Sequence, residues 1–292
     1  MHITNETSRL ECRFLHAEQF DAVHQSFVDG FSDYIIKFEL SARQFQNHIT
    51  LNAVDLHRSV GCFDGDSPVG LSLNGFGSWD GKPTVYDAGT AVLPKYRRQG
   101  ISRSMFEWMV PQFQEQGFQQ FLLEVISNNE PALRLYDQLG FARTRELLLL
   151  EAASLAESDH PLPDGIEIRE IHRHESIPFA TFWDGMPSWQ NTLEAVDRSV
   201  QLKRIFGAFD GQSCVVYIVF SAGMGRLAQL AVNRAHRRNG IGTHLLREMQ
   251  KDAGDQKLVV INLDESMTES VVFFQNRGFS KLLGQFEMVM EL

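Results

Sequence analysis

The chain has 292 residues and carries 27 Lys+Arg against 37 Asp+Glu, a formal net charge of −10. Its length suggests two domains of roughly 150 residues, and a content of 43% hydrophobic and 22% charged residues excludes a disordered or collagen-like chain. The acidic balance argues against a nucleic-acid partner, which needs a basic surface, and mildly favours amine-bearing substrates.

The sequence shows neither a metal-binding pattern nor a targeting segment. The three cysteines are far apart and form no CxxC spacing, so we expect neither a disulfide framework nor a metal site. No apolar run reaches the roughly 18 residues of a membrane span, and the first residues lack the charged and apolar regions of a secretory signal. We therefore expect a cytoplasmic protein with no membrane partner.

An internal repeat organises the chain. Three short motifs occur twice in the same order, and the offset between the copies drifts only slowly, as expected for a duplicated domain with small deletions. The matching segments are 61–67 and 207–213, 97–102 and 237–242, and 140–141 and 278–279. A polar stretch with two prolines separates the copies. We therefore predict an N-terminal domain at 1–155, a linker at 156–165 and a C-terminal domain at 166–292.

Both copies are expected to contain the same elements in the same order. A hairpin turns at Asp64-Gly65 in the first copy, and amphipathic helices begin near Ile101 and Ile241 and end near Gly117 and Gly254. Further strands are expected at 59–63, 68–73, 85–92 and 120–126, and at 166–171, 205–209, 214–220, 227–232 and 257–263. Each copy then has a second helix and a closing strand. This pattern predicts an α/β (α+β mixed) fold, in which each domain is a mixed, mostly antiparallel sheet flanked by helices.

The loop between the third strand and the first long helix indicates an anion site. Both copies place Arg-Arg-x-Gly-Ile-Ser/Gly there, at 97–102 and 237–242. A helix N-terminus exposes unpaired N–H groups and a partial positive charge, and small residues let a phosphate approach the backbone. The glycine pattern of a dinucleotide fold and the Gly-Lys-Ser/Thr of a P-loop are both missing. A phosphate-bearing cofactor of another kind is therefore implied.

This loop resembles the acetyl-CoA pyrophosphate loop of the GNAT family of N-acetyltransferases. That family has Arg/Gln-x-x-Gly-x-Gly/Ala after a strand, as in 92–102 of this chain, although Ser102 departs from the usual small residue. Its other signature, Asn-x-x-Ala followed by Tyr-x-x-x-Gly-Phe, is similar to Asn129–Phe141. Because the second copy matches in outline, the whole chain resembles a tandem GNAT protein, which implies acetyl-CoA as co-substrate.

The resemblance assigns cofactor contacts in the first copy. The backbone around Thr90–Val92 would pair with the pantetheine arm. The loop from Arg97 to Arg103 would bind the diphosphate, and Asn129 would hydrogen-bond the end of the pantetheine arm. The residues concerned are Thr90, Ala91, Val92, Arg97, Arg98, Gln99, Gly100, Ile101, Ser102, Arg103 and Asn129.

The resemblance also assigns the chemistry of the first copy. Tyr136 would be the general acid, because a phenol is protonated at neutral pH and can donate to a leaving thiolate. Glu124 matches the position of a general base in some ribosomal-protein N-acetyltransferases, and Asp87 is the competing candidate. Phe31 and Tyr34 lie in the region that lines the acceptor cleft in the family, so we expect them to contact substrate.

The second copy keeps the loop but departs from the catalytic pattern. Met267, Phe274 and Asn262 stand where the first copy has Asn129, Tyr136 and Glu124, so neither a phenol nor a carboxylate is expected. A second cofactor site would use Val232, Arg237, Arg238, Gly240, Ile241, Gly242 and Thr243. We expect a catalytically silent copy that either has a structural role or helps to form the substrate cleft.

We therefore predict an N-acetyltransferase that moves an acetyl group directly from acetyl-CoA to a small-molecule or peptide amine in the N-terminal domain. One alternative is a non-catalytic CoA-binding sensor or scaffold on the same fold. Another is an acyltransferase that uses a longer acyl-CoA or a protein amine. The sequence leaves the acceptor and a homodimer open.

Overall fold

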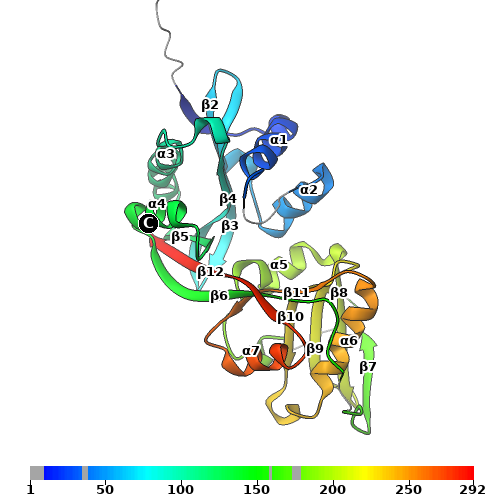
Figure 1. Ribbon diagram of the computed structural model, residues 1–292. Helices are drawn as coiled ribbons and strands as arrows, with labels where there is room; N and C mark the ends of the chain where they lie inside the picture. Colours follow the sequence, from blue (N-terminus) through cyan, green and yellow to red (C-terminus); the bar gives the residue numbers. More distant parts are fainter. Residues whose placement is uncertain (1–9, 35–38, 158–159, 173–178) are drawn as a thin grey trace, which may run out of the picture. The chain divides into compact units, whose positions relative to one another are not determined.

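The computed structural model describes residues 10–34, 39–157, 160–172 and 179–292, and Figure 1 shows it as a ribbon. The chain divides into two compact units. Unit 1 contains Met1–Val125, Asn129–Arg143 and Met288–Leu292, and unit 2 contains Ile126–Asn128 and Thr144–Glu287. Both are built of mixed α and β structure, which confirms the predicted fold class.

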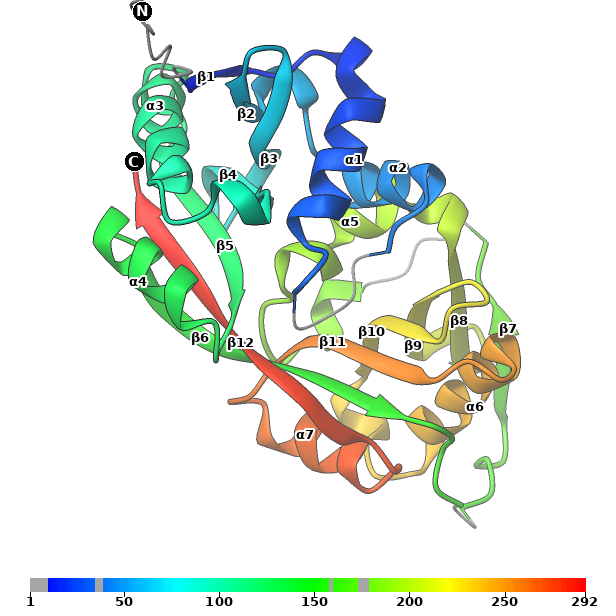
Figure 2. The ribbon, with the colours of Figure 1, turned by 45° about the horizontal axis from the view of Figure 1, so that its top comes forward.

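Unit 1 is a twisted sheet with helices on both faces. Its strands follow the order β1-β2-β3-β4-β5, all antiparallel except the parallel pair β4 and β5. The elements are β1 (Glu11–Phe14), α1 (Phe20–Gly30), α2 (Ala42–Leu51), β2 (Val60–Asp64), β3 (Ser67–Trp79), β4 (Lys82–Val92), α3 (Ile101–Glu115), β5 (Gln120–Ile126) and α4 (Glu130–Leu139), with short 3-10 turns at Ala17–Gln19, Leu56–Arg58 and Pro94–Tyr96. Figures 1 and 2 show α1 and α2 on one face of the strands and α3 and α4 on the other.

Unit 2 repeats this plan. Its strands follow the order β12-β6-β11-β10-β9-β8-β7, and β10 and β11 are the parallel pair. The elements are β6 (Ala142–Ala152), β7 (Ile166–Glu170), α5 (Leu193–Arg198), β8 (Lys203–Asp210), β9 (Ser213–Ser221), β10 (Arg226–Val232), α6 (Ile241–Ala253), β11 (Leu258–Asp264), α7 (Thr268–Gln275) and β12 (Ser280–Glu291), with 3-10 turns at Phe179–Phe182, Trp189–Asn191, Val200–Leu202 and Arg234–His236.

Strand β9 shows why these sheets need helices on both faces. Its apolar run has no polar alternation, because Val216 and Ile218 pack with α6 while Tyr217 and Val219 pack with Phe182 on the opposite face. Side chains alternate across a strand, so a strand that is apolar at every position must be covered on both sides. The two packed layers hold β10, and therefore the loop that follows it, in a fixed position.

The two copies share a bulge at the same place in their third strand. The register of β4 with β3 shifts between Asp87 and Gly89, which leaves Ala88 as the extra residue. The register of β10 with β9 shifts between Leu227 and Gln229, which leaves Ala228 in the same role. A bulge turns a strand locally and changes the direction of its side chains. Both strands therefore bend just before the loop with the repeated arginines.

The closing strands do not follow the repeat. Strand β6, which closes the first copy in sequence, pairs antiparallel with β11 in unit 2. In unit 1, the N–H of Leu292 donates to the carbonyl oxygen of Gln119, 2.9 Å away. The compact units and the repeat thus differ at these strands, and residues 156–165, of which 158–159 lie outside the described residues, join β6 to β7.

Two structural features bear on the exclusions drawn from the sequence. Cys12 and Cys62, distant along the chain, face each other across β1 and β2, and all three cysteines are free thiols. No helix in the described part of the chain is both long enough and apolar enough to cross a membrane.

Candidate active site

In the first copy, the β4–α3 loop presents a helix N-terminus to the solvent. Arg98 and Gly100 adopt left-handed backbone angles, with φ of +62° and +79°. The N–H of Ser104 donates to the carbonyl oxygen of Gly100 at 2.9 Å, which closes the first turn of α3. The preceding N–H groups of that turn have no partner within the helix, and a Cβ on Gly100 would meet nothing within 4 Å. This arrangement fits an anion such as a diphosphate.

Arg97 holds this loop in place. Its guanidinium donates to both carboxylate oxygens of Asp33, at 2.6 and 2.7 Å, and to the carbonyl oxygen of Gly30, while its Nε donates to that of Val92. The same contact keeps the pKa of Asp33 below its ordinary value. Arg97 therefore ties the loop to the end of α1, and a diphosphate contact by this side chain stays a prediction. The side chains of Arg98 and Ser102 do not make these contacts to α1 and β4.

Asp87 and Tyr136 form a buried pair beside the bulge of β4. The Asp87 carboxylate accepts hydrogen bonds from the Thr90 hydroxyl at 2.8 Å, the Gly89 N–H at 2.9 Å and the Tyr136 hydroxyl at 3.3 Å. Burial raises the pKa of Asp87 to about 6, although these hydrogen bonds oppose the rise. The pKa of Tyr136 lies well above its ordinary value because the phenol is buried and Asp87 is close. Tyr136 is therefore protonated, as a general acid must be.

Tyr34 joins this pair to the start of α4. Its hydroxyl is hydrogen-bonded to Asn129, and its pKa is raised by burial and, to a smaller extent, by the charge of Asp87. Asn129 also caps α4, because its Oδ1 accepts from the Ala132 N–H at 3.4 Å. The ring of Phe31 packs against that of Tyr34, with centroids 5.1 Å apart. Tyr34 thus lies next to the predicted acid and Phe31 packs against Tyr34. The contact of Tyr34 with Asn129 was not predicted.

Glu124 lies on the other face of the same sheet. Its Oε2 accepts a hydrogen bond from the Tyr86 hydroxyl at 2.6 Å. Tyr86 and Leu122 are register partners, and side chains alternate along a strand, so Tyr86 and Glu124 share one face while Asp87 points to the opposite one. The two carboxylates predicted as alternative bases therefore lie on opposite faces of the sheet, and Asp87 accepts a hydrogen bond from Tyr136. Tyr86 was missed by the sequence analysis.

Strands β4 and β5 stop pairing just where these groups lie. In the described part of the chain, their parallel register runs from Thr84 and Gln120 to Tyr86 and Leu122. Beyond it, β4 continues through the bulge to Val92, which places Thr90, Ala91 and Val92 between the buried pair and the helix N-terminus. An extended backbone segment of this kind can pair with another extended chain that carries amide groups.

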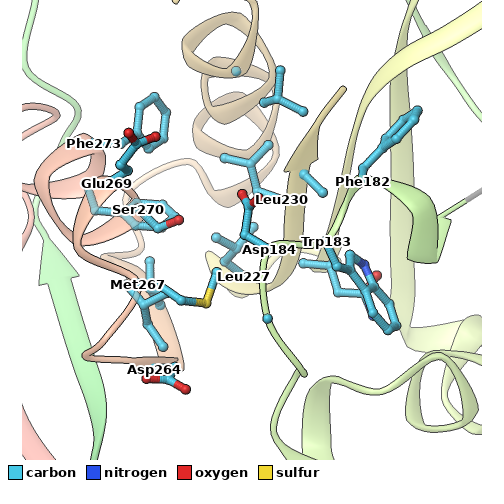
Figure 3. Close-up of a pocket in the computed structure, with 18 of the residues that line it drawn as sticks. Phe182, Trp183, Asp184, Leu227, Leu230, Asp264, Met267, Glu269, Ser270 and Phe273 are labelled. Carbon is cyan, nitrogen blue, oxygen red and sulfur yellow. The ribbon is translucent and has the colours of Figure 1, made fainter. Parts of the chain in front are cut away.

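The second copy holds a cavity of about 560 Å³ around the equivalent loop. It lies between β10, α7 and the segment before α5, and Figure 3 shows Met267, Glu269 and Phe273 opposite Asp184 and Leu230. All residues proposed from sequence for a second cofactor site line it: Val232, Arg237, Arg238, Gly240, Ile241, Gly242 and Thr243. Arg237 repeats the role of Arg97, since it pairs with Asp184 at 2.8 Å and donates to the Val232 carbonyl.

The polar groups of the first copy are absent from the corresponding positions of this cavity. Register places Leu227 and Leu230 at the positions of Asp87 and Thr90, and the helix motif places Met267 and Phe274 at those of Asn129 and Tyr136. All four line the cavity.

One sequence correspondence needs correction. Arg226 pairs with Val259 as Tyr86 pairs with Leu122, so Ile261, and not Asn262, occupies the position of Glu124. Asn262 is an extra residue with a φ of +57° at an irregularity of β11. An inserted residue changes the offset between the copies within one strand, which a comparison of sequence motifs does not reveal.

Family models match both copies. The Acetyltransferase (GNAT) family model covers residues 20–141, and an Acetyltransferase (GNAT) domain model covers residues 201–281. The chain is therefore a tandem member of the GNAT acetyltransferase family, which confirms the resemblance drawn from its motifs. The [Ribosomal protein bS18]-alanine N-acetyltransferase of Escherichia coli (strain K12) is 32% identical over 77 residues, which are 26% of this chain and 46% of that protein. The matched region is thus less than half of that relative.

Solved structures share the fold over nearly the whole chain. A tandem GNAT protein from the clavulanic acid biosynthesis pathway has a TM-score of 0.72 at 14% identity and covers 97% of this chain and 98% of its own. A GCN5-related N-acetyltransferase from Sphaerobacter thermophilus has a TM-score of 0.69 at 15% identity and covers 97% and 95%. At these identities the likeness concerns the fold alone.

Proposed function

We propose that this protein is an N-acetyltransferase that transfers the acetyl group of acetyl-CoA to a primary amine, and that the N-terminal copy carries the reaction. The observation that carries the proposal is the buried pair of Tyr136 and Asp87, in the same copy as the solvent-exposed helix N-terminus of α3. The first copy has both a proton donor and an anion site, whereas the second has an anion site and apolar side chains at the matching positions.

The residues of the first copy fit acetyl-CoA. The N–H groups of the first turn of α3, with Arg98 beside them, are suited to a diphosphate. Thr90–Val92 pairs with β3 on one side and extends past the last register pair of β4 and β5. Its other side is suited to the amides of pantetheine, although the Val92 carbonyl already accepts from Arg97. Asn129, at the start of α4, is placed to bind the far end of the pantetheine arm. When bound, acetyl-CoA supplies an acetyl group activated as a thioester.

The side chains divide the proton transfers between the two faces of the sheet. Tyr136 donates its proton toward the sulfur that leaves, and Asp87 holds the phenol in place. Burial and, after it, the charge of Asp87 raise the pKa of the phenol. A small aliphatic amine has an ordinary pKa near 10 and the N-terminal amine of a peptide one of about 8, so both are mostly protonated at pH 7 and must lose a proton before they attack. Glu124 is suited to accept that proton, because it lies on the face covered by α1 and α2, away from the acid. Of the two candidate bases, the geometry favours Glu124, with Asp87 as a positioning residue.

The acceptor is proposed to be the N-terminal amine of a peptide or a small primary amine. The relative from Escherichia coli is named for acetylation of an alanine of a ribosomal protein, and the aromatic side chains of Phe31 and Tyr34 stand at the entrance expected for the acceptor. An aromatic cluster of this kind can contact the apolar part of an amine substrate.

The proposal is tested by replacing Tyr136 with phenylalanine. We expect turnover of acetyl-CoA with a panel of peptide and small amines, measured as release of the free CoA thiol. In Tyr136→Phe, kcat should fall at least about tenfold, because acid catalysis of this kind typically contributes 10²–10⁴ in rate. Acetyl-CoA affinity should change little, since the phenol is not part of the anion site.

Two results would count against the proposal. Unchanged turnover in Tyr136→Phe would remove this residue from the mechanism. Acetyl-CoA binding without turnover of any amine would favour the non-catalytic sensor on the same fold.

A further inference from the structure

The second-copy cavity has apolar side chains at the positions that carry the catalytic and hydrogen-bonding groups of the first copy. Its diphosphate end keeps the arginines and glycines of the loop. In place of the acid and the hydrogen-bonding residues of the first copy, its lining has Leu227, Leu230, Met267 and Phe274. Every polar group that would meet a short acetyl thioester in the first copy is thus replaced by a hydrocarbon or thioether side chain.

Several of the polar residues that line this cavity have partners within the protein. The Asp184 carboxylate pairs with Arg237 at 2.8 Å. Gln229 donates to the carbonyl oxygen of Asn191 at 2.5 Å and accepts from Tyr217 at 3.1 Å.

Two further polar groups are paired in the same way. Asp264 accepts from Ser266 at 2.6 Å and pairs with Arg145 at 3.4 Å. The Oδ1 of Asn262 accepts from Gln285 at 3.3 Å. Because these groups are paired, the surface offered to a ligand beyond the loop is mainly apolar.

We propose that the cavity of the C-terminal copy binds an acyl-CoA with a medium-length aliphatic acyl chain and holds it without transferring the acyl group. The arginine-glycine loop receives the diphosphate, and Leu227, Leu230, Met267 and Phe274 receive the chain. The CoA part of this inference rests on the family membership of the second copy, and the acyl part rests on the lining. Phe274 and Leu227 cannot donate or accept a proton, so the thioester stays intact.

The test isolates the second site in the full-length chain. Ser102→Glu places a carboxylate at the diphosphate position of the first copy and blocks that site. In this variant, calorimetry should show octanoyl-CoA binding about sixtyfold tighter than acetyl-CoA. Each buried methylene tightens binding up to about fourfold, and this figure assumes that about half of the added methylenes are buried. No amine-dependent release of CoA thiol from octanoyl-CoA should occur.

Restoring the first copy's residues provides the matched control. In the Ser102→Glu background, Leu230→Thr with Met267→Asn should remove most of the preference for octanoyl-CoA while CoA itself binds as before. Thermal unfolding shows whether these variants fold, and Leu230→Thr alone is the second variant if the pair does not. Octanoyl-CoA binding no tighter than acetyl-CoA, or a preference that the variant does not change, would overturn the inference.

The outcomes also separate this inference from the proposed function. A protein that prefers octanoyl-CoA in its second site but acetylates no amine supports the inference and contradicts the proposed function. A protein that acetylates amines but shows no acyl-chain preference supports the proposed function and overturns the inference.

Discussion

Replacing Asp87 with asparagine is expected to lower kcat about a hundredfold and, at pH 8, to raise the free energy of unfolding by up to about 3 kcal/mol. Turnover falls because Tyr136 loses the carboxylate that accepts its hydrogen bond and holds its phenol in place. Stability rises because the protein no longer buries an ionised carboxylate. Residues that serve a site at the expense of stability commonly behave in this way.

The sign of the stability change follows from the raised pKa of Asp87. Its pKa rises from 3.8 to about 6 on folding, so between these values the folded state binds more protons than the unfolded state. The free energy of unfolding therefore falls as the pH rises through this range, and the full cost, on the order of 3 kcal/mol, is present above about pH 6. In Asp87→Asn this cost disappears. The net gain in stability is smaller than the cost by the free energy lost when the hydrogen bonds to Thr90 and Tyr136 change.

Glu124→Gln serves as the matched comparison. Urea unfolding of both variants and the original protein, measured between pH 4.5 and 8, should show a stability gain for Asp87→Asn alone, and that gain should shrink toward pH 4.5. Turnover should fall in both variants. Below about pH 6, kcat should fall as Asp87 becomes protonated. This acidic decrease of kcat should be missing in Asp87→Asn but present in Glu124→Gln. A stability gain that does not change with pH would contradict burial of the charged form.

The family and much of the site could be predicted from sequence because they depend on local patterns. The loop at 97–102, the spacing from Asn129 to Gly140-Phe141 and the repeat are contiguous in the chain, and the hairpin turn at Asp64-Gly65 needs only local backbone geometry. The helix N-terminus follows directly from such a pattern, because the glycine and the strand–loop–helix order define it.

The remaining features depend on contacts between distant segments. The pairs Tyr86 with Glu124, Tyr34 with Asn129 and Arg97 with Asp33 join residues 38, 95 and 64 positions apart. No local pattern marks such a pair. The face on which each carboxylate lies depends on the register of β4 and β5, which the sequence does not specify. The pairing of the closing strand β6 with β11 of unit 2 also depends on strand pairing. Two similar copies offer more than one possible partner to such a strand.

A matched pair of substitutions is expected to show which copy carries the reaction. Ser102 and Gly242 occupy the same position in the first turns of α3 and α6. A glutamate there places a negative charge where a diphosphate would bind, and the helix dipole favours an acidic residue in the first turn. At Gly242, a new Cβ would lie 3.6 Å from Phe273 and 3.7 Å from Val232, which is ordinary contact.

Ser102→Glu should lower kcat/KM for acetyl-CoA at least about a thousandfold, and Gly242→Glu should leave it within about twofold. Ser102→Glu removes charge-assisted and backbone contacts to a dianionic group, each worth about 1.5–3 kcal/mol. Gly242→Glu alters only the C-terminal copy, which has leucine, methionine and phenylalanine at the catalytic positions. Calorimetric titration with CoA should show one site lost in each variant. Activity that survives Ser102→Glu but disappears in Gly242→Glu would place the reaction in the C-terminal copy, and the chemistry would then have to use groups other than Tyr136, Asp87 and Glu124.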